Sequence, residues 1–199
     1  MPDLATPKQV VLATGNIGKV AEMQSTLKEF GFNVLPQTNF DFPEAIEDGL
    51  SFVENAIKKA RHACEHTGLA AIADDSGLEV DALNGAPGIY SARYADGQGD
   101  KANNTKLLNA LANHELRAAR FRCVLVMMRH TSDPTPIICT GTWEGEISKV
   151  AKGENGFGYD PIFFCPKHNC HAAELDPKTK QTVSHRALAL KQLQQLLTL

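Results

Sequence analysis

Short apolar runs that alternate with segments of helical periodicity constrain the fold of this chain more than any other feature. Residues 9–13, 33–35 and 69–73 are apolar runs with the length of buried strands. Residues 20–30 and 53–64 separate them and carry apolar side chains at helical spacing. This strand–helix–strand order favours an α/β fold in which helices cover a sheet.

The second half of the chain predicts strands of a different kind. Residues 121–128 and 137–143 are the two longest strand candidates, and their short connection favours an antiparallel hairpin. A helix is expected around residues 107–111, and another is expected from about Ser184 to the end of the chain. The sheet should therefore be mixed rather than purely parallel.

Capping and turn residues predict where several helices and strands begin or end. Ser51 and Glu54 form a capping box ahead of one helix, and Gly31 stands where a glycine would end the preceding helix. Residues 38–49 are acidic and aperiodic, which predicts a loop. Residues 74–77, Asp-Asp-Ser-Gly, are expected to stop the strand at 69–73, and residues 84–88 have the composition of a turn.

Composition excludes several classes of protein. A length of 199 residues fits one domain over 1–199, built as a single body or as two closely packed lobes. No apolar run approaches the ~18–20 residues that span a bilayer, and the first eight residues do not resemble a secretory signal. A net charge of −3 argues against nucleic-acid binding, and five scattered cysteines indicate reduced thiols in the cytoplasm.

The first candidate site lies between the strand at 9–13 and the helix that follows it. Glycines and a helix N-terminus can present backbone amides to an anion, and a lysine adds a full positive charge. A plain strand–helix turn is the alternative interpretation, and the glycine spacing is not that of a P-loop. The residues predicted to bind phosphate are Thr14, Gly15, Asn16, Ile17, Gly18 and Lys19.

The second candidate site is the acidic pair Asp74 and Asp75. Two adjacent carboxylates at the end of a buried strand need a cation or a proton to neutralise them. Their hard oxygens suit Mg²⁺, and the acidic loop offers Glu44, Glu47 and Asp48 as further ligands. The alternative is that Asp74 caps a turn while Asp75 is solvated.

Two further segments have the chemistry to hold a nucleotide. Residues 153–161 interleave three glycines with Phe157 and Tyr159, so a tight loop could lay a ring against a base while Asp160 accepts a hydrogen bond. Residues 178–186 place cations at the start of the last helix, where the helix dipole disfavours them unless they hold a ligand. Core aromatics and ordinary surface charge are the respective alternatives.

Cysteine and histidine also gather at Cys165, His168, Cys170 and His171. Their residue types suit zinc, but they lack the paired and separated spacing of a structural zinc site. A buried cysteine next to a polar loop is the preferred interpretation.

Taken in order, these segments resemble the Ham1-like family of inosine/xanthosine triphosphate pyrophosphatases along essentially the whole chain. The matching strings are residues 13–19, Ser-Phe-Val-Glu-Asn-Ala at 51–56, residues 73–78, 85–94, Gly-Phe-Gly-Tyr-Asp-Pro at 156–161, and Ser-His-Arg at 184–186. The resemblance implies an elongated, two-lobed α/β fold around a long mixed sheet with flanking helices. It also implies an active cleft between the lobes and a homodimer.

The same resemblance implies roles for individual residues. Asp75 matches the catalytic carboxylate and a metal ligand, Ser76 touches substrate, and Glu47 matches a second metal ligand, although Glu44 lies close enough in sequence to leave that choice open. Residues 14–19 should line the triphosphate. The remaining contacts to base and phosphate match Phe157, Gly158, Tyr159, Asp160, Lys180, His185 and Arg186.

The expected activity is Mg²⁺-dependent hydrolysis of ITP, dITP and XTP to the monophosphate and pyrophosphate. Asp75 would orient the water that attacks the α-phosphorus. Donors at Lys180, His185 and Arg186 would meet a 6-oxo group and leave adenine's 6-amino group unmatched. A related pyrophosphatase for pyrimidine or methylated nucleotides is the alternative enzyme. A non-catalytic nucleotide-binding or nucleic-acid-binding module is the alternative outside enzymes.

Overall fold

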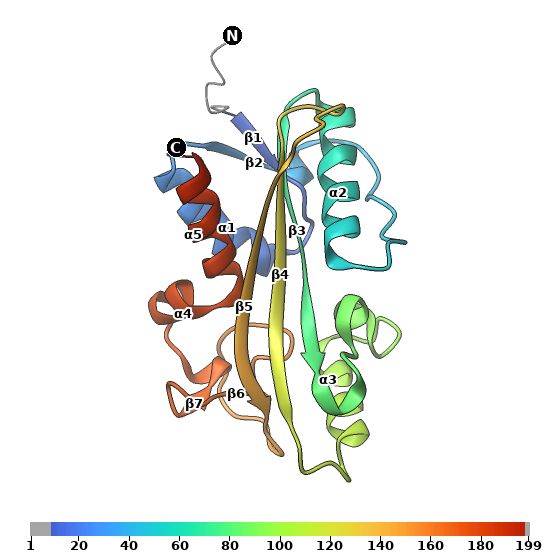
Figure 1. Cartoon of the computed structure of the whole chain (residues 1–199), viewed down its shortest axis with the longest axis vertical. Helices are drawn as coiled ribbons and strands as arrows, with labels where there is room; N and C mark the ends of the chain where they lie inside the picture. The colour runs from blue at the N-terminus through green and yellow to red at the C-terminus, as the bar shows by residue number, and fades with distance from the viewer. Residues whose placement is uncertain (1–8, 198–199) are drawn as a thin grey trace. The chain divides into compact units, whose positions relative to one another are not determined.

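The structure is a computed structural model that describes residues 9–197, apart from the side chains of Ile17 and Ser25. Its strands form one seven-stranded sheet in the order β2-β1-β3-β4-β5-β6-β7 (Figure 1). β1 runs parallel to β2 and β3, whereas β6 runs antiparallel to β5 and β7. The strands are β1 (Gln9–Leu12), β2 (Asn33–Pro36), β3 (Ala70–Val80), β4 (Ala118–Met128), β5 (Ile137–Ile147), β6 (Phe163–Cys165) and β7 (Cys170–His171).

Five α-helices flank this sheet, so the predicted α/β class with a mixed sheet is confirmed. They are α1 (Ile17–Glu29), α2 (Phe52–Thr67), α3 (Asp100–Ala110), α4 (Pro177–Val183) and α5 (His185–Leu197). Short 3₁₀ turns occur at η1 (Gln37–Asn39), η2 (Asp81–Leu83), η3 (Gly88–Arg93) and η4 (Ala172–Glu174). Within residues 9–197, no helix is long and apolar enough to cross a membrane.

Local capping explains where the first two long helices begin and end. The Asn16 side chain accepts a hydrogen bond from the Lys19 amide at the start of α1, and the Ser51 hydroxyl accepts one from the Glu54 amide at the start of α2. Gly31 follows α1 with a φ of 85°, and Gly68 ends α2 with a φ of 68°. The predicted serine cap and glycine stop are confirmed, and the Glu54 carboxylate reaches back to the Leu50 amide at 3.0 Å.

The prediction that residues 74–77 end a strand is wrong. β3 continues from Ala70 through Asp74 and Asp75 to Val80, so the two carboxylates lie in the middle of a strand and not at its end. Both aspartates are buried, at 0% and 6% exposure, and each has a lysine partner. These ion pairs offset part of the charge penalty that otherwise disfavours an acidic pair in a buried strand.

The last part of the chain also differs from the prediction. The α4 helix precedes α5, whereas the sequence predicted a single closing helix. Asp176 caps α4 by accepting a hydrogen bond from the Thr179 amide, and Pro177 occupies the first turn. The Ser184 hydroxyl accepts a hydrogen bond from the Ala187 amide, which confirms Ser184 as the cap of the last helix.

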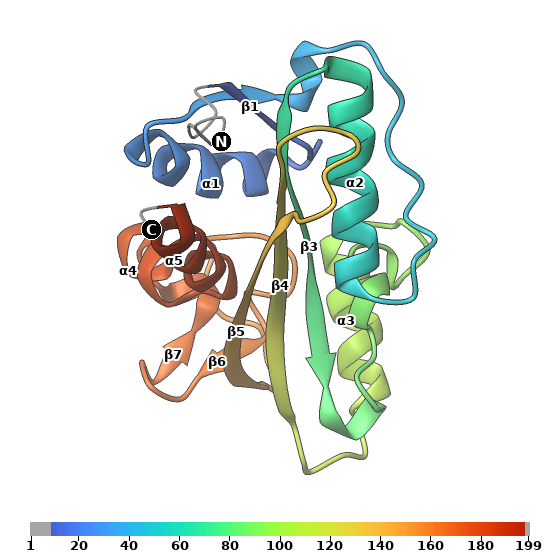
Figure 2. The same cartoon turned by 45° about the horizontal axis from the view of Figure 1, so that its top comes forward.

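The chain forms two compact units. The first contains the residues up to Asp75, then Val124–Thr140 and the residues from Ala189. Within it, α1 and α2 lie on opposite faces of β1 and β3 (Figure 2). The α2 side of this core is made of small and medium-sized residues: Val11, Ala13, Ala56, Ala60, Ala63, Cys64, Ala71, Ala73, Val126 and Met128.

The second unit comprises Ser76–Cys123 and Gly141–Leu188. Three aromatic side chains from three strands meet at its centre. The Phe121 and Phe163 ring centroids are 4.5 Å apart, and Trp143 lies 5.3 Å from Phe163. Leu107 and Leu111, from α3 and its C-terminal end, join the same core. Trp143 is therefore a core aromatic.

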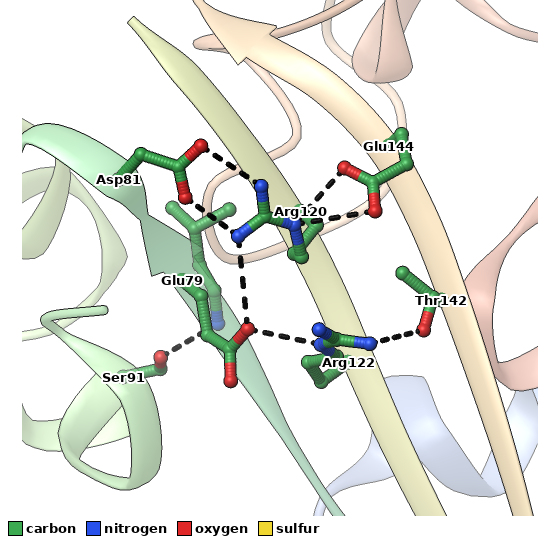
Figure 3. A network of polar contacts seen from close by, with 8 residues as sticks. Glu79, Asp81, Ser91, Arg120, Arg122, Thr142 and Glu144 are labelled. Carbon is green, nitrogen blue, oxygen red and sulfur yellow. Dashed lines mark hydrogen bonds and ion pairs between the residues drawn. The ribbon is translucent and has the colours of Figure 1, made fainter. Parts of the chain in front are cut away.

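The opposite face of β4 and β5 carries a charged network, which Glu79 of β3 and Asp81 join (Figure 3). Arg120 on β4 pairs with Asp81 at 2.6 Å and with Glu144 on β5 at 3.0 Å. Arg122 pairs with Glu79 at 2.9 Å and donates to the Thr142 hydroxyl at 2.6 Å. The facing pairs 120/144 and 122/142 show that β4 and β5 run antiparallel, as predicted.

All five cysteines are free thiols. Cys64, Cys123, Cys139 and Cys165 are buried, and Cys170 is half-buried. Burial raises the pKa of the Cys64 and Cys139 thiols to about 11. Such thiols are poor nucleophiles at neutral pH. Their burial and lack of disulfide bonds agree with the reduced thiols that the sequence predicted.

Candidate active site

The acidic pair on β3 is the centre of the candidate site in the first unit. Adjacent residues of a strand point to opposite faces, and the two carboxylates accordingly have different partners. Lys19 Nζ lies 3.1 Å from Asp74 Oδ2, and Lys59 Nζ lies 3.1 Å from Asp75 Oδ1. The structure thus joins the predicted phosphate-binding lysine to the predicted acidic pair.

Lys59 is the main residue that sequence reasoning missed. It projects from α2, and its ammonium group contacts both Asp75 and Glu47, the latter at 3.2 Å. Burial favours the neutral amine, but the carboxylates of Asp74, Asp75 and Glu47 outweigh it and raise the pKa of Lys59. The side chain is only 12% exposed and stays cationic. A lysine among buried alanines on a helix was the available signal.

Asn55 is a second residue that the sequence did not single out as part of the site. It is fully buried, and its side-chain amide donates to Asp75 Oδ2 at 3.4 Å. Its carbonyl oxygen accepts from the Gly49 amide at 2.8 Å, and its amide also reaches the Gly49 carbonyl at 3.5 Å. Asn55 and Lys59 are one helical turn apart, so the same side of α2 holds Asp75 through two contacts.

Glycine is required at position 49 for steric reasons. A Cβ atom there would lie 2.6 Å from Asn55 Oδ1 and 2.8 Å from Glu54 Cβ. The end of the acidic loop is thereby held against the start of α2, two residues after Glu47. Glu47 is therefore held near Asp75 in two ways: by the contact between Gly49 and Asn55, and by the ion pairs of Lys59.

The three candidate acids of the loop have different surroundings. Glu47 shares Lys59 with Asp75, whereas Glu44 is exposed and its Oε1 lies 3.0 Å from where a Cβ of Gly15 would be. Asp48 pairs with Lys58 at the surface. Of the three acids, Glu47 is the one whose contacts reach the acidic pair.

The environment of Asp75 makes its carboxylate more basic than a surface aspartate. Burial raises the pKa of Asp75, and the negative charge of Glu47 raises it further. The ammonium groups of Lys59 and Lys19 oppose this shift without cancelling it. A carboxylate with a raised pKa is a better proton acceptor for an attacking water.

The predicted phosphate-binding segment forms the turn into α1. The Thr14 hydroxyl accepts from the Asn16 amide at 3.2 Å, while Gly15 and Asn16 are exposed. α1 begins at Ile17, so Gly18 and Lys19 lie in its first turn, not in a preceding loop. The side chain of Ile17 lies outside the described part of the molecule. This arrangement leaves backbone amides and the positive end of a helix dipole beside Lys19.

The second unit brings together the cationic and aromatic residues predicted to hold a base. Asp160 Oδ2 accepts from the Phe157 amide at 2.9 Å and from Lys180 Nζ at 2.7 Å. Lys180 Nζ lies 5.0 Å from the Phe157 ring centroid, and Arg186 Cζ lies 5.9 Å from it. Arg186 also donates to the Ser76 hydroxyl at 3.0 Å. Two cations, Lys180 from α4 and Arg186 from α5, thus lie near one aromatic ring.

Two of the predicted base-binding residues belong mainly to the core of this unit. The Tyr159 hydroxyl donates to the Ser91 carbonyl at 2.9 Å, and its ring packs in the core that contains Phe163. His185 is 7% exposed, and its ring stacks on Phe121 with centroids 4.8 Å apart. Gly158 lies between Phe157 and Tyr159 with a φ of 65°, which favours glycine.

The cysteine- and histidine-rich segment has a structural role. Cys165 faces Cys170 across β6 and β7, and His171 Nδ1 lies 2.9 Å from Glu174 Oε2. Within residues 9–197, no three or more His, Cys, Asp or Glu side chains are grouped to hold a metal. Cys165 is buried, as the preferred interpretation of this segment expected.

The chain is similar to known proteins along almost its whole length. The dITP/XTP pyrophosphatase of Vibrio vulnificus strain YJ016 is 61% identical over 189 residues, which are 94% of each chain. The corresponding enzyme of Thioalkalivibrio sulfidiphilus is 59% identical over 92% of this chain and 95% of its own. The HAM1 protein from Coxiella burnetii is a solved structure with a TM-score of 0.89 and 51% identity, covering 96% of this chain and 98% of its own.

The family assignment rests on nearly the whole sequence. The sequence model of the Ham1 family matches residues 10–196, which include every motif quoted above from the phosphate-binding turn to the last helix. The buried aspartate pair, its lysine partners and the cation-flanked aromatic loop all lie in the matched region. The chain is therefore a member of the Ham1 family.

Proposed function

We propose that this chain hydrolyses non-standard purine nucleoside triphosphates, namely dITP, ITP and XTP, to the monophosphate and pyrophosphate. The observation that carries the proposal is Asp75, a buried carboxylate held by Lys59 and Asn55 and linked through Lys59 to Glu47. The relatives named dITP/XTP pyrophosphatase support the choice of substrate class. Their similarity extends over almost the entire length of both chains.

In this proposal the first unit binds the triphosphate. The backbone amides of the turn at residues 14–18 and the N-terminus of α1 attract phosphate oxygens, and Lys19 contributes its charge. Lys19 is already paired with Asp74, so its ammonium group is held in place before substrate arrives. Pre-positioned charge lowers the entropic cost of binding a flexible triphosphate.

Charge balance in the first unit supports a requirement for Mg²⁺. Three carboxylates, on Glu47, Asp74 and Asp75, contact two ammonium groups, on Lys19 and Lys59. A triphosphate would add several more negative charges to a set that is already net negative. Mg²⁺ commonly uses one or two carboxylates together with substrate phosphates, so Glu47 and Asp75 fit as its protein ligands. The bound ion would neutralise phosphate charge.

Asp75 performs the central step of the proposed reaction. Its carboxylate orients a water molecule toward the α-phosphorus and accepts a proton as the water attacks. The bond from the α-phosphorus to its bridging oxygen breaks, and pyrophosphate departs with that oxygen. Lys59 and Asn55 hold the carboxylate in one orientation during this step.

In the second unit, selectivity for the base comes from donors around Phe157. Lys180 and Arg186 can donate to the 6-oxo group of hypoxanthine or xanthine, but they have no acceptor to meet on the 6-amino group of adenine. Asp160 holds Lys180 in place, and Ser76 accepts from Arg186. The face of Phe157 provides a surface on which a purine can stack.

The decisive experiment is a screen of purified protein against ITP, dITP, XTP, ATP, GTP, dUTP and TTP with Mg²⁺, measuring pyrophosphate and orthophosphate separately. We expect pyrophosphate from the first three, abolished by a metal chelator and restored by added Mg²⁺. Asp75→Asn, which preserves the side-chain volume, should be folded and inactive. Preference for dUTP or TTP would identify a pyrimidine enzyme instead. Nucleotide binding without turnover would identify a binding module.

The proposal includes a homodimer that acts in the cytoplasm. Its support is the family membership and the set of free, reduced cysteines. Light scattering coupled to size-exclusion chromatography measures the mass in solution directly. A mass of one chain across the working concentration range would remove the dimer from the proposal.

A further inference from the structure

Helix α3 holds the proposed base-binding loop by its backbone. The Gly158 amide donates to Asp100 Oδ2 at 2.6 Å, and the Gly158 carbonyl accepts from Asn104 Nδ2 at 3.1 Å. Asp100 and Asn104 are four residues apart, so they project from the same side of α3. Both polar groups of one glycine are therefore bound by a helix more than fifty residues earlier in the sequence.

These contacts determine where the loop can place Phe157. Gly158 directly follows Phe157 and has a φ of 65°, in the left-handed region that favours glycine. Because a glycine backbone is intrinsically flexible, other contacts are needed to hold it in one conformation. The Phe157 amide is fixed by Asp160 Oδ2 at 2.9 Å. With Gly158 held by α3 as well, the backbone on each side of the Phe157 side chain is fixed.

The orientation of the Asn104 amide indicates that its donor is the functional atom. Nδ2 must face the Gly158 carbonyl, because two oxygens in that position would repel. Asn104 Oδ1 is then buried without a hydrogen-bond partner among residues 9–197. A buried unsatisfied oxygen is costly, and an apolar side chain would avoid it. This cost in stability is explained if the hydrogen bond that Asn104 donates to Gly158 is needed for function.

We propose that Asp100 and Asn104 are positioning residues that hold the Phe157–Gly158 backbone in the geometry that receives the purine base. This inference rests on the proposed function. The two residues act through the loop and contribute to base recognition without contacting the phosphates. Their effect should therefore appear with ligands that carry a base and be absent with inorganic pyrophosphate.

A neighbouring residue on α3 offers a matched control. Asn103 is buried, and its side chain accepts from the Ala95 amide at 2.6 Å and donates to the Ala92 carbonyl at 3.2 Å. It fixes a different loop by the same chemistry, since its side-chain hydrogen bonds go to Ala95 and Ala92 and not to Gly158. Asn103→Ala should lower stability at least as much as Asn104→Ala while leaving base recognition intact.

The test measures the Kd of IMP and the Kd of pyrophosphate by calorimetry with Mg²⁺, together with the Tm and with kcat/KM for ITP. We expect Asn104→Ala to raise the Kd of IMP roughly threefold to tenfold, since one neutral hydrogen bond is lost, with the Kd of pyrophosphate unchanged. Asn104→Asp has nearly the same shape but no donor, so it should fail in the same way. Asp100→Ala should also weaken IMP binding, and Asp100→Asn should restore it, because an amide oxygen still accepts from Gly158.

Each result decides the matter. Normal IMP binding by Asn104→Asp, or proportional weakening of IMP and pyrophosphate, would overturn the positioning role. Loss of IMP binding by Asn103→Ala to the same degree would also overturn it, by showing that any damage to α3 has this effect. If the wild-type protein neither cleaves ITP nor binds IMP, the proposed function fails, and this inference fails with it.

Discussion

Lys59 Nζ lies 3.1 Å from Asp75 Oδ1 and 3.2 Å from Glu47 Oε1, so one ammonium group connects the acidic loop to the acidic strand. The lysine is 12% exposed, and the Asp75 side chain is 8% exposed. A partly desolvated charge shared by two carboxylates is a strong constraint on their positions. The Lys59 ammonium group thus holds Glu47 and Asp75, the two proposed metal ligands, in place by contacts within the protein.

Replacing this cation should impair turnover severely. We expect Lys59→Met to lower kcat for ITP by roughly tenfold to a hundredfold, the range for losing a charge-assisted hydrogen bond of about 1.5–3 kcal/mol. With the ammonium group gone, Glu47 and Asp75 should bind Mg²⁺ more tightly, so half-maximal activity should need less Mg²⁺. Steady-state rates over a Mg²⁺ titration measure both effects.

Lys58→Met is the control for that prediction. Lys58 is the preceding residue on α2, and it pairs with Asp48 at the surface, where ion pairs contribute little. The activity and the Mg²⁺ dependence of Lys58→Met should match those of the wild type. Equal losses in the two variants would mean that general electrostatics, and not the contact with Asp75, explain the effect.

Lys19→Ala should separate binding of the phosphate chain from binding of the product. Lys19 stands in the first turn of α1, beside the amides proposed to hold phosphate. Its loss should weaken binding of a non-hydrolysable triphosphate analogue much more than binding of the monophosphate product. Titration calorimetry on an otherwise identical sample measures both. Similar losses for the two ligands would move Lys19 to the base or to a structural role through Asp74.

Arg186→Ala should change the choice of base. Arg186 is 2% exposed, donates to Ser76 and lies 5.9 Å from the Phe157 ring centroid. We expect kcat/KM for ITP to fall roughly tenfold to a hundredfold, because a charged donor to the 6-oxo group is lost, while the low activity on ATP changes little. Lys178→Ala removes an exposed cation of α4 and should leave both rates unchanged. If ITP and ATP lost activity in proportion, Arg186 would be a phosphate or structural contact.

The turn between β4 and β5 predicts a pH-dependent contribution to stability. The Arg129 guanidinium holds the pKa of Asp133 well below its usual range, and the Asp133 carboxylate also accepts from the Thr135 amide at 3.0 Å. A lowered pKa in the folded state means that the contribution is complete above the unfolded value, about 3.9, and is lost as the pH falls below it. Asp133→Asn should therefore cost about 1–2 kcal/mol at neutral pH.

Urea unfolding of the two proteins at neutral pH and near pH 3 measures this contribution. The difference in unfolding free energy should be largest at neutral pH and should shrink in acid, because the unfolded wild type takes up a proton on Asp133 while the folded wild type keeps it ionised. A difference that stays constant, or grows as the pH falls, would show that the Arg129–Asp133 pair does not stabilise the turn through its charge.

The sequence predicted those parts of the fold that have a local signal. An apolar run predicted the strand at 9–12, and apolar periodicity with an N-terminal cap predicted the helix at 52–67. Both elements were found. α4 was missed because none of its residues is buried, so no apolar period marks it. β3 was interrupted in the prediction because Asp74 and Asp75 look like a turn. Lys59, which neutralises Asp75 in the structure, lies 16 residues away in sequence.

The residues of the candidate site fall into the same two groups, those with a local sequence signal and those without one. Lys19, Asp75 and Phe157 stand in motifs of unusual composition, and the sequence identified all three. Lys59 and Asn55 occupy ordinary positions on an amphipathic helix, where lysine and asparagine are usually solvent-facing. Only the packing of α2 shows that this side of the helix meets Asp75.

The contacts of Asn55 with Gly49 and Asp75 have a consequence for insertions and deletions in this chain. The stretch from Glu47 to Asn55 contains the closed contact at Gly49 and the capping box, so one residue more or fewer would pull Glu47 away from Lys59. The Phe42 ring stacks on His66 of α2, and the Pro43 carbonyl lies 2.7 Å from His62 Nε2 on the same helix. Residues 44–46 lie between these contacts and Glu47, and the loop can change length there at modest entropic cost. Length variation among functional variants should therefore fall before Glu47 and spare the segment that follows it.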